Sequence, residues 1–377
     1  MAKKRVVLLR SNPVNPDSRV EKETSALADF GFDVTVLCWD RDSDYKIQIG
    51  SLSDSRIRVI RIGCKASFGE GLKNIIPYLK FQFGMRKWLI KHREEYDLIH
   101  ACDFDTANFT LSIARHYNKL FIFDIFDFLC GDPKNLLQRI VKKRQLGIIN
   151  HSDATIICNE ERKVQIKGST PKQLAVIHNS PPEIVLDDNS VSLPGEVKIV
   201  YVGILSDNRL LKEEVEVFKK HRDWFFYVGG FGLHKDFFES TSKEYDNIVF
   251  MGKLPYEDTL KLERTADILL AVYDPAIENH RFAAPNKFYE GLMLGKPLVM
   301  VKNTGMSSEV ENNKVGVLID YSAKGFEDGI QSLLERRNEW PEMKTKMINL
   351  YKEKYSWSEM RNRLRDLYEN VCSGENK

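Results

Sequence analysis

Short runs of apolar, often β-branched residues alternate along the first half of the chain with longer segments in which apolar residues recur at helical spacing. The apolar runs are short, as buried strands are, and most of the intervals between them have the pattern of amphipathic helices. The runs predict strands at 6–10, 34–38, 57–62, 98–101, 120–124, 154–158 and 175–178. Strands that alternate with helices in this way predict a doubly wound parallel sheet.

A second series of strands and helices follows a break in this pattern. Residues 186–196, LDDNSVSLPGE, have no apolar period and contain a Pro-Gly pair, so we place a linker there. The second series predicts strands at 198–202, 224–228, 248–251, 268–272, 297–301 and 317–319. We therefore expect an α/β protein with two Rossmann-like doubly wound domains, at 1–190 and 197–357, that face a central cleft. The helical segment 358–371 follows the last strand and could pack back on the first domain.

Composition and charge narrow the class of protein. A length of 377 residues suits two domains, and 42% hydrophobic with 29% charged residues is typical of a globular chain in water. The net charge of +2 gives no support for binding of nucleic acid. The six cysteines have neither zinc-site nor redox-pair spacing, and no stretch is long and apolar enough to span a membrane. A cytoplasmic protein with reduced thiols is expected.

One short segment, PNKFYEGLMLGKPLV, combines several features of a ligand site. Pro285 suits the first position of a helix and Gly295 the residue after its end, which predicts a helix at 286–294. Lys287 and Glu290 then share one face of that helix. Amides at the start of such a helix favour phosphate, and a carboxylate one turn further could accept the hydroxyls of a ribose. An ordinary surface ion pair between the two side chains is the alternative.

Further stretches accompany this segment along nearly the whole chain. They are SRVEKETSALADFGFDVTVLC (18–38), YDLIHACDFDTA (96–107), AVIHNSPP (175–182), IVYVGILSDNR (199–209), NIVFMGKLPYEDTLKLERTADILLAVY (247–273) and YSWSEM (355–360). Each stretch is weak by itself, but the ordered set resembles the GT-B glycosyltransferases. The resemblance is to the large retaining family four, the group 1 type, which also builds bacterial capsules and lipopolysaccharides.

The resemblance implies that the second domain binds a nucleotide-diphosphate sugar. Glu290 matches the acid that holds the donor ribose, Asn286 belongs to the segment whose amides line the diphosphate, and Lys287 could add charge. The family usually has another acid eight positions before Glu290, where this chain has Phe282, so the identity of the donor sugar stays open. A UDP-sugar is favoured over a GDP-sugar only by its frequency in the family.

Residues at other strand ends complete the expected donor site. The family commonly has a glycine here at Gly203 and an arginine directly after it, but this chain has Ile204 at that place. Arg209 is the expected substitute, because a guanidinium can grip phosphate oxygens with two donors. Gly230 would allow close approach of the backbone to a ligand. The segment that resembles the family's base-reading backbone comprises Gly252, Lys253 and Leu254.

Polar residues at strand ends of the first domain are expected on the acceptor side. The resemblance places His100 and Asp103 there, and Asp127 follows the next strand. Arg19, at the start of the first helix, could face the cleft or form a salt bridge. Asp103 and Asp105 also spell a DxD metal motif, but that motif belongs to a different glycosyltransferase fold, so no metal is expected.

The resemblance implies a retaining transfer of a hexose-type sugar to a glycan or lipid-linked acceptor, as in bacterial surface polysaccharide synthesis. Such chemistry needs positive charge at the departing diphosphate, for which Arg209, Lys287 and helix amides are the candidates. Asp103 and Asp127 are expected to position the acceptor. In this family the departing phosphate is commonly described as taking the acceptor proton, so neither a catalytic nucleophile nor a cofactor is expected.

Residues 51–93 are strongly basic, with ten Lys and Arg against Asp54 and Glu70. Part of this region, LKNIIPYLKFQFGMRKWLIKHR, mixes aromatic and aliphatic residues with cations. Such a segment could lie on an anionic leaflet, which would make the protein peripheral on the inner face of the membrane. A core-facing helix with a solvated basic face is the alternative.

Other functions are compatible with the same architecture. A sugar-nucleotide epimerase would need an acid/base set around the sugar, and no convincing set is found. A catalytically inactive nucleotide-sugar-binding subunit is suggested by Cys102, Ile204 and Phe282, which stand where relatives carry polar residues. A dehydrogenase is disfavoured because no GxGxxG motif follows the first strand.

Overall fold

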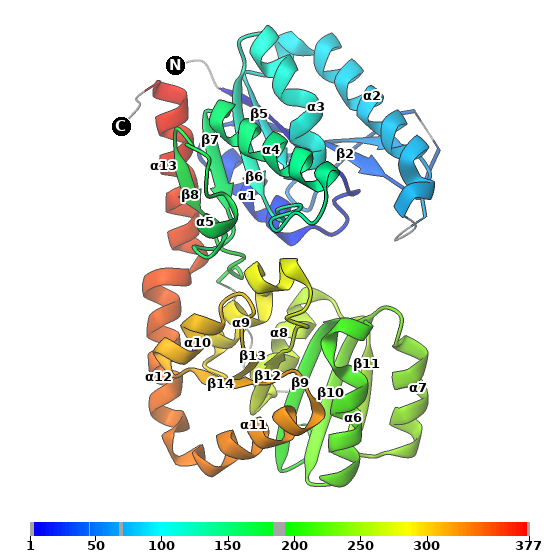
Figure 1. Cartoon of the computed structure of the whole chain (residues 1–377), viewed down its shortest axis with the longest axis vertical. Coiled ribbons are helices and arrows are strands. Elements are labelled where there is room, and N and C mark those ends of the chain that lie inside the picture. Colours follow the sequence, from blue (N-terminus) through cyan, green and yellow to red (C-terminus); the bar gives the residue numbers. More distant parts are fainter. Residues whose placement is uncertain (1–3, 45, 68–70, 184–192, 375–377) are drawn as a thin grey trace. The chain divides into compact units, whose positions relative to one another are not determined.

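The computed structural model of the 377-residue chain describes residues 4–44, 46–67, 71–183 and 193–374. The chain divides into two compact units (Figure 1). The first comprises Met1–Ile177 together with Met360–Lys377, and the second comprises His178–Glu359. Each unit is an α/β fold built on one mainly parallel sheet, so the predicted fold class is confirmed.

The first unit contains a sheet with the strand order β3-β4-β2-β1-β5-β6-β7-β8. Its strands are β1 (Arg5–Arg10), β2 (Asp33–Asp40), β3 (Gln48–Ser51), β4 (Arg58–Gly63), β5 (Leu98–Cys102), β6 (Leu120–Ile125), β7 (Ala154–Ile157) and β8 (Leu174–Val176). The strand order reverses between β1 and β5, and ligands bind in doubly wound sheets outside the carboxyl ends of strands at such a point.

Helices cover both faces of this sheet, and α2, α3 and α4 pack beside one another in sequence order. The helices of the first unit are α1 (Ser18–Asp29), α2 (Ile75–Lys91), α3 (Asp103–His116), α4 (Leu136–His151), α5 (Arg162–Gln165) and most of α13 (Trp357–Ser373), with 3₁₀ turns η1 (Gly71–Asn74) and η2 (Arg93–Glu95). Helix α1 begins where the Asp17 side chain accepts a hydrogen bond from the amide of Val20, which is an ordinary N-cap.

Strand β3 is the one element of this sheet that the sequence pattern does not predict. It pairs antiparallel with β4, from Gln48 opposite Arg61 to Ser51 opposite Arg58, whereas the other neighbouring strands are parallel. Its residues, QIGS, are mostly exposed and include a glycine. A short edge strand of this kind buries no apolar face, so it has no alternation that could reveal it.

Helix α13 contains the helical segment predicted at 358–371 and packs on the first unit from Met360 onward. Tyr368 is fully buried there, with its ring 5.2 Å from that of Phe32 in an edge-on contact. Arg363 donates a hydrogen bond to the carbonyl of Val176 in β8. In Figure 1 this helix, drawn in red, lies beside β8.

The second unit contains a fully parallel sheet with the strand order β11-β10-β9-β12-β13-β14. Its strands are β9 (Val197–Ile204), β10 (Trp224–Phe231), β11 (Ile248–Gly252), β12 (Ile268–Ala271), β13 (Leu298–Val301) and β14 (Gly316–Ile319). Every strand predicted for this half of the chain is present. The strand order reverses between β9 and β12, which marks the expected ligand edge.

Strands β12 and β13 are buried along their whole length, as strands of a parallel sheet covered on both faces are. The covering helices are α6 (Leu211–Lys220), α7 (Lys235–Glu244), α8 (Tyr256–Thr265), α9 (Asn286–Leu294), α10 (Ser307–Asn313), α11 (Ala323–Glu335) and α12 (Trp340–Leu350), with the 3₁₀ turns η3 (Asp207–Arg209), η4 (Glu278–Phe282) and η5 (Arg337–Glu339) and the π-helical turn η6 (Tyr351–Tyr355). None of the described helices combines the length and apolar character needed to cross a membrane.

The second unit begins at His178, before the predicted linker. His178 is buried, and its Nδ1 lies 2.9 Å from the hydroxyl of Tyr289. The Tyr351 hydroxyl donates to the carbonyl of Pro181 at 3.0 Å. These contacts hold 178–181 in the second unit. The linker predicted at 186–196 lies largely outside the described residues, which resume at 193.

Candidate functional site

Three glycines mark the carboxyl ends of neighbouring strands in the second sheet. Gly203 of β9 is paired with Gly230 of β10, and Gly252 of β11 is paired with Gly229. Gly230 has a φ of +140°, and a Cβ there would lie 1.8 Å from the carbonyl oxygen of Gly203, so only glycine fits. A glycine therefore stands at or near the end of each of these strands, and the last residues of β9 and β10, Ile204 and Phe231, have exposed apolar side chains.

Helix α9 extends over the residues that the sequence predicts, Asn286–Leu294. Gly295 ends it in the left-handed region with a φ of 64°. Asn286 at its first turn is exposed. The Nζ of Lys287 lies 5.3 Å from the centre of the Tyr201 ring, and only 3.5 Å from the position of a Cβ on Gly203. The start of α9 thus brings a cation to the end of β9.

Arg209, in η3, lies near two tyrosines, Tyr201 and Tyr273. Its guanidinium stacks on the ring of Tyr273 at 4.0 Å and donates to the side-chain oxygen of Asn208 at 3.0 Å. Its NH1 also lies 3.2 Å from Nε2 of His280. The Nδ1 of that histidine lies 2.9 Å from the carbonyl oxygen of Asp274, so Nδ1 donates there and Nε2 accepts from the guanidinium.

Tyr201 connects the two cations. Burial raises the pKa of the Tyr201 hydroxyl, and the positive charge of Arg209 opposes this shift. The neutral hydroxyl donates to the carbonyl of Ile204 at 2.8 Å and so supports the turn after β9. Among the described residues neither Arg209 nor Lys287 forms an ion pair with an acid. This arrangement suits an anionic ligand with more than one charge.

Glu290 is buried one turn after Lys287, with 2% of its surface exposed. Its Oε1 accepts a hydrogen bond from the hydroxyl of Tyr256 at 3.1 Å. A second acid, Glu263 of α8, is fully buried beside it. Burial and then the charge of Glu290 raise the pKa of Glu263, while Lys287 opposes the shift. The raised pKa favours the protonated form of Glu263 beside Glu290.

The segment after β11 lies at the same edge. Gly252 has a φ of 67° with open space where a Cβ would stand. Lys253 is exposed, with its Nζ 5.5 Å from the ring of Phe231. Leu254 packs against the end of β10, where a Cβ on Gly229 would lie 3.2 Å from its methyl group. The predicted base-reading segment therefore adjoins Gly230 and Gly203.

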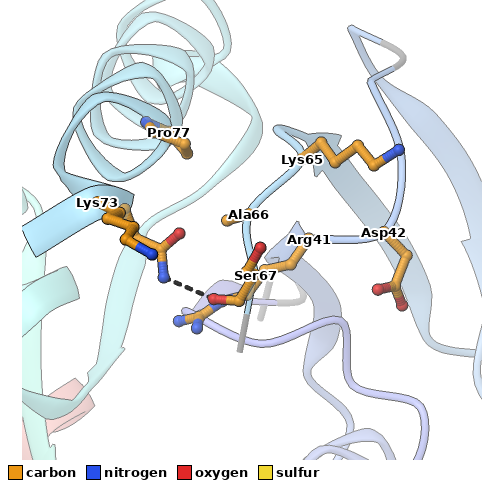
Figure 2. A pocket seen from close by; sticks show the side chains of 8 residues that line it. Arg41, Asp42, Lys65, Ala66, Ser67, Lys73 and Pro77 are labelled. Carbon is orange, nitrogen blue, oxygen red and sulfur yellow. Dashed lines mark hydrogen bonds between the residues drawn. The ribbon is translucent and has the colours of Figure 1, made fainter. Parts of the chain in front are cut away.

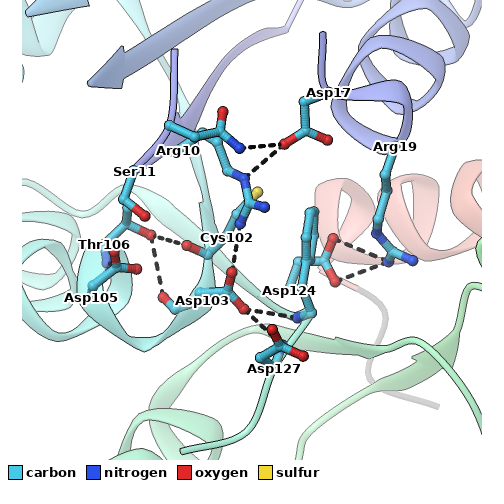
Figure 3. Close-up of polar contacts among 12 residues, drawn as sticks. Arg10, Ser11, Asp17, Arg19, Cys102, Asp103, Asp105, Thr106, Asp124 and Asp127 are labelled. Carbon is cyan, nitrogen blue, oxygen red and sulfur yellow. Dashed lines mark hydrogen bonds and ion pairs between the residues drawn. The ribbon is translucent and has the colours of Figure 1, made fainter. Parts of the chain in front are cut away.

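In the first unit, Asp103 holds two strand ends together (Figure 3). Its Oδ1 accepts hydrogen bonds from the amides of Phe126 at 2.9 Å and Asp127 at 3.0 Å, and its Oδ2 pairs with Arg10 at 2.5 Å. Its backbone has a φ of +66°, a conformation that a non-glycine residue adopts at a cost of about 1–3 kcal/mol. Burial raises the pKa of Asp103 to about 7, although Arg10 opposes the shift.

Asp127 and Arg19, which the sequence also predicts on the acceptor side, each form ion pairs. Asp127 has a side chain that is 60% exposed and pairs with the buried guanidinium of Arg162 at 3.1 Å. Arg19 is buried between Glu23 at 3.1 Å and Asp124 at 3.0 Å. Burial raises the pKa of Glu23, so Asp124 is the acid that balances the guanidinium. Figure 3 shows Arg19 directed at the carboxylate of Asp124.

His100 is fully buried at the end of β5. Its Nδ1 lies 2.7 Å from the hydroxyl of Tyr368, and its Nε2 lies 3.4 Å from Asp124. His100, Cys102 and Asp124 have possible metal-ligand atoms within 4.8 Å of one another. The set fits a metal poorly, because Asp124 binds Arg19 and burial raises the pKa of the Cys102 thiol well above its usual value.

Sequence reasoning missed the aromatic and acidic neighbours of the predicted residues. In the second unit these are Tyr201, Tyr256, Glu263, Tyr273 and His280, and in the first unit Arg10 and Arg162. Arg10 could have been found, since it is the last residue of a predicted apolar strand. Tyr201, Tyr256, Glu263 and Tyr273 lie in stretches that resemble the family, but their contacts are with other elements, which those stretches do not reveal.

Comparison with known proteins agrees with this architecture. Residues 196–336 match the family described as Glycosyl transferases group 1. No curated protein sequence matches the chain significantly. Sucrose-phosphate synthase from Thermosynechococcus elongatus is similar with a TM-score of 0.76 and 15% identity, over 99% of this chain and 100% of that chain.

Two structures with bound nucleotide are similar as well. An E. coli trehalose-6-phosphate protein bound with UDP-2-fluoro glucose has a TM-score of 0.72 and 10% identity, over 98% of this chain and 99% of that chain. HepE from Anabaena in complex with UDP-glucose has a TM-score of 0.70 and 13% identity, over 98% of this chain and 99% of that chain. These likenesses define the GT-B fold of two Rossmann-like domains. The family match at 196–336 lies within the second unit.

Proposed function

We propose that the chain transfers a hexose-type sugar, with retention of configuration, from a UDP-sugar to a glycan or lipid-linked acceptor in bacterial surface polysaccharide synthesis. The observation that carries the proposal is the placement of Arg209 and Lys287 around Tyr201 at the end of β9, without an acid to pair with in the described chain. A diphosphate would supply the missing negative charge. UDP and UDP-glucose in the complexes of HepE favour uridine as the base.

The donor is proposed to lie along the carboxyl edge of the second sheet, at the glycines of β9, β10 and β11. The diphosphate would lie against Gly203 and the amide of Asn286, with the two cations on its oxygens. The ribose would reach Glu290, whose Oε1 is oriented by Tyr256 and which lies beside Glu263. Gly252, Lys253 and Leu254 follow β11 at the same edge and would present backbone groups to the base.

The reaction breaks the bond between the sugar's anomeric carbon and the diphosphate oxygen and forms a bond to an acceptor hydroxyl on the same face. The acceptor proton passes to the departing phosphate. Arg209 and Lys287 stabilise the charge that develops on that phosphate. Electrostatic stabilisation of this kind is usually the largest single contribution to catalysis. The residues of this chain supply the charge without a metal or cofactor.

The acceptor is proposed to bind at the carboxyl edge of the first sheet. Asp127 has the exposed carboxylate there, oriented by Arg162. Asp103 would act by fixing the turn at Phe126 and Asp127, because both of its oxygens are already bonded. Arg19 and His100 lie deeper and would support the edge without touching the acceptor.

Product analysis tests this function against its rivals. The full chain is incubated with UDP-sugars with and without a panel of glycan and lipid-linked acceptors, and the anomeric configuration of the product is read by NMR. Transfer with retention supports the proposal. Epimerised donor in the absence of acceptor would support an epimerase, and donor binding without turnover would support an inactive binding subunit. Glu290→Gln should weaken UDP-sugar binding about tenfold or more, since a hydrogen bond to a charged group contributes about 1.5–3 kcal/mol. The exposed Glu257→Gln on α8 is the matched control.

We propose further that the protein binds the inner face of the membrane through α2. Its exposed apolar side chains include Phe83 at 72%, Ile76 at 65% and Leu79 at 41% exposure. Lysines lie on the same helix at Lys80 and Lys87, among others. A helix that exposes both kinds of side chain suits an anionic leaflet, where each cation contributes about 1 kcal/mol.

Vesicle co-sedimentation tests this surface. Binding to vesicles that contain anionic lipid is expected to fall several-fold in the double variant Ile76→Ser/Phe83→Ser. The control is Val164→Ser on α5, where the valine is equally exposed at 67%. Equal binding of the double variant and the control would remove the membrane from the account.

A further inference from the structure

We propose that an open pocket at the carboxyl edge of the first sheet binds a phosphoryl group of the acceptor. This inference rests on the proposed transferase function and specifies its acceptor as an anionic, phosphate-bearing molecule. The pocket has a volume of about 550 Å³. Its lining residues are Arg41, Asp42, Lys65, Ala66, Ser67, Lys73, Asn74 and Pro77.

The pocket follows two strand ends and the start of a helix. Figure 2 shows the loop of Lys65, Ala66 and Ser67 between α2, which carries Pro77, and the end of β2, which Arg41 follows. Loops at the carboxyl ends of parallel strands are where doubly wound sheets bind ligands. The pocket therefore belongs to the same edge of the sheet as Asp103.

Cations predominate among the charged residues of the lining. Arg41, Lys65 and Lys73 are cations, and Asp42 is an acid. Such a lining suits a phosphate dianion better than a single carboxylate. Several cations around one open volume gain most from a ligand with several acceptor oxygens.

Arg41 is held in place by two contacts that leave it further hydrogen-bond donors. Its guanidinium stacks on the Trp39 ring at 4.1 Å, and its NH2 donates to the carbonyl of Ser11 at 3.2 Å. Its Nε is buried and has no hydrogen-bond partner in the described part of the chain. Burial also lowers the pKa of Arg41. The terminal nitrogens of the guanidinium have N–H groups to spare, and these could donate to phosphate oxygens in the pocket.

Hydrogen bonds within the protein hold the segments that line the pocket in place. The amide of Cys64 donates to the carbonyl of Asp40, and that of Ala66 donates to the carbonyl of Arg41, both at 2.9 Å. The side chain of Asn74 donates to the carbonyl of Ser67 at 2.6 Å. These bonds join the end of β2, the loop after β4 and the start of α2, so the cations need little reorganisation to bind.

A chain of contacts links the pocket to the acceptor-side residues. Arg41 reaches the carbonyl of Ser11, and Ser11 follows Arg10, which pairs with Asp103. Asp105, two residues further along, contacts the Ser11 side chain and raises the pKa of Arg41 by its charge. A phosphate in the pocket would thus lie next to the residues proposed to position the acceptor.

Calorimetric titration of inorganic pyrophosphate into the full chain tests the pocket. UDP is present at saturation, so that the donor edge is occupied and cannot bind the probe. Lys65→Gln and Lys73→Gln change exposed side chains and should leave folding intact. Each is expected to weaken pyrophosphate binding about three- to tenfold, and the double variant more. The control is Lys143→Gln, an exposed lysine on α4.

Two further arms separate the sources of the phosphate. Glucose 1-phosphate represents a soluble acceptor, and polyprenyl phosphate in neutral vesicles represents a lipid-linked acceptor. Binding of either that depends on Lys65 and Lys73 supports the pocket and identifies the source. Pyrophosphate affinity that is the same in the double variant and the control overturns it. UDP affinity, measured in separate titrations of the same variants, tests the donor edge of the proposed function independently of the pocket.

Discussion

The cations at the carboxyl edges of the two sheets differ in whether they form ion pairs with acids. At the edge of the second sheet, Arg209 and Lys287 surround Tyr201 without an acidic partner among the described residues. At the edge of the first sheet, Arg10 pairs with two acids and Arg19 lies between two acids. The first network is neutralised internally, whereas the second has positive charge available for a ligand.

We infer from this difference that the Arg10 and Arg19 network supports the fold of the first edge, whereas Arg209 and Lys287 are available to bind the donor. Buried ion pairs stabilise only while both partners are present, so changes at the first edge should act on folding. Cations without acidic partners contribute little to folding, and changes at the second edge should act on donor binding and turnover. The predictions below test this division.

The largest expected effect is on stability, from Arg19→Met. The change leaves the carboxylate of Asp124 buried with its ion pair broken, which should lower the free energy of unfolding by about 3–5 kcal/mol. Chemical denaturation of the full chain measures the loss. Arg56→Met removes an arginine that pairs on the surface with Asp29 and Asp54, and it should have a much smaller effect. Equal losses in the two variants would remove the special role of the buried network.

A comparable effect on catalysis, without a loss of stability, is expected from Arg209→Ala. Removal of one fixed charge from the departing phosphate should lower turnover about 10²–10³-fold. The melting temperature should remain close to that of the unchanged chain, since Arg209 is bound to Asn208 and His280 and not to an acid. Initial rates at saturating donor give the measurement. A variant with a lowered melting temperature but normal turnover would contradict the roles proposed for the two edges.

A smaller effect, on both folding and donor binding, is expected from Gly230→Ala. The new Cβ would collide with the carbonyl of Gly203 and would need a φ of +140°, at a cost of about 1–3 kcal/mol. The matched change Gly252→Ala meets open space at a φ of 67° and should be milder. Thermal shift with and without UDP compares the variants. If the two substitutions behave alike, the close approach of β9 and β10 has no role in the site.

The smallest effect, when counted per pH unit, is a pH dependence of stability at Asp103. Its pKa is about 7 in the folded chain, above the value of about 3.9 expected when unfolded, so the folded chain holds the proton to higher pH. The contribution of Asp103 to stability should therefore fall by up to about 1.4 kcal/mol per pH unit as pH rises from about 4 to 7, and then level off. Denaturation of the chain and of Asp103→Asn across this range measures the difference. A difference that does not vary with pH would show that Asp103 is ionised throughout.

The sequence predicts the fold better than it predicts the contacts at the site. All the strands proposed from apolar runs are present, and α9 has the predicted bounds because Pro285 and Gly295 mark its ends. The pattern missed β3, whose exposed residues give no alternation.

Within the site, motifs brought the correct strand ends together but not the side-chain partners. Lys287 and Gly203 meet as their positions in the fold imply. Tyr256 and Glu263 reach Glu290 from another helix, and Asp124 reaches Arg19 from a strand far along the chain. Such pairings depend on packing between elements, which periodicity and spacing do not encode.

The central claim is that the second unit binds a nucleotide diphosphate at the carboxyl edge of its sheet, and a crystal structure of the chain with UDP tests it most directly. The account predicts the diphosphate beside Gly203, within reach of Arg209 and Lys287, with the ribose hydroxyls on Glu290. UDP bound at another place, or Glu290 still bonded only to its protein neighbours, would contradict it.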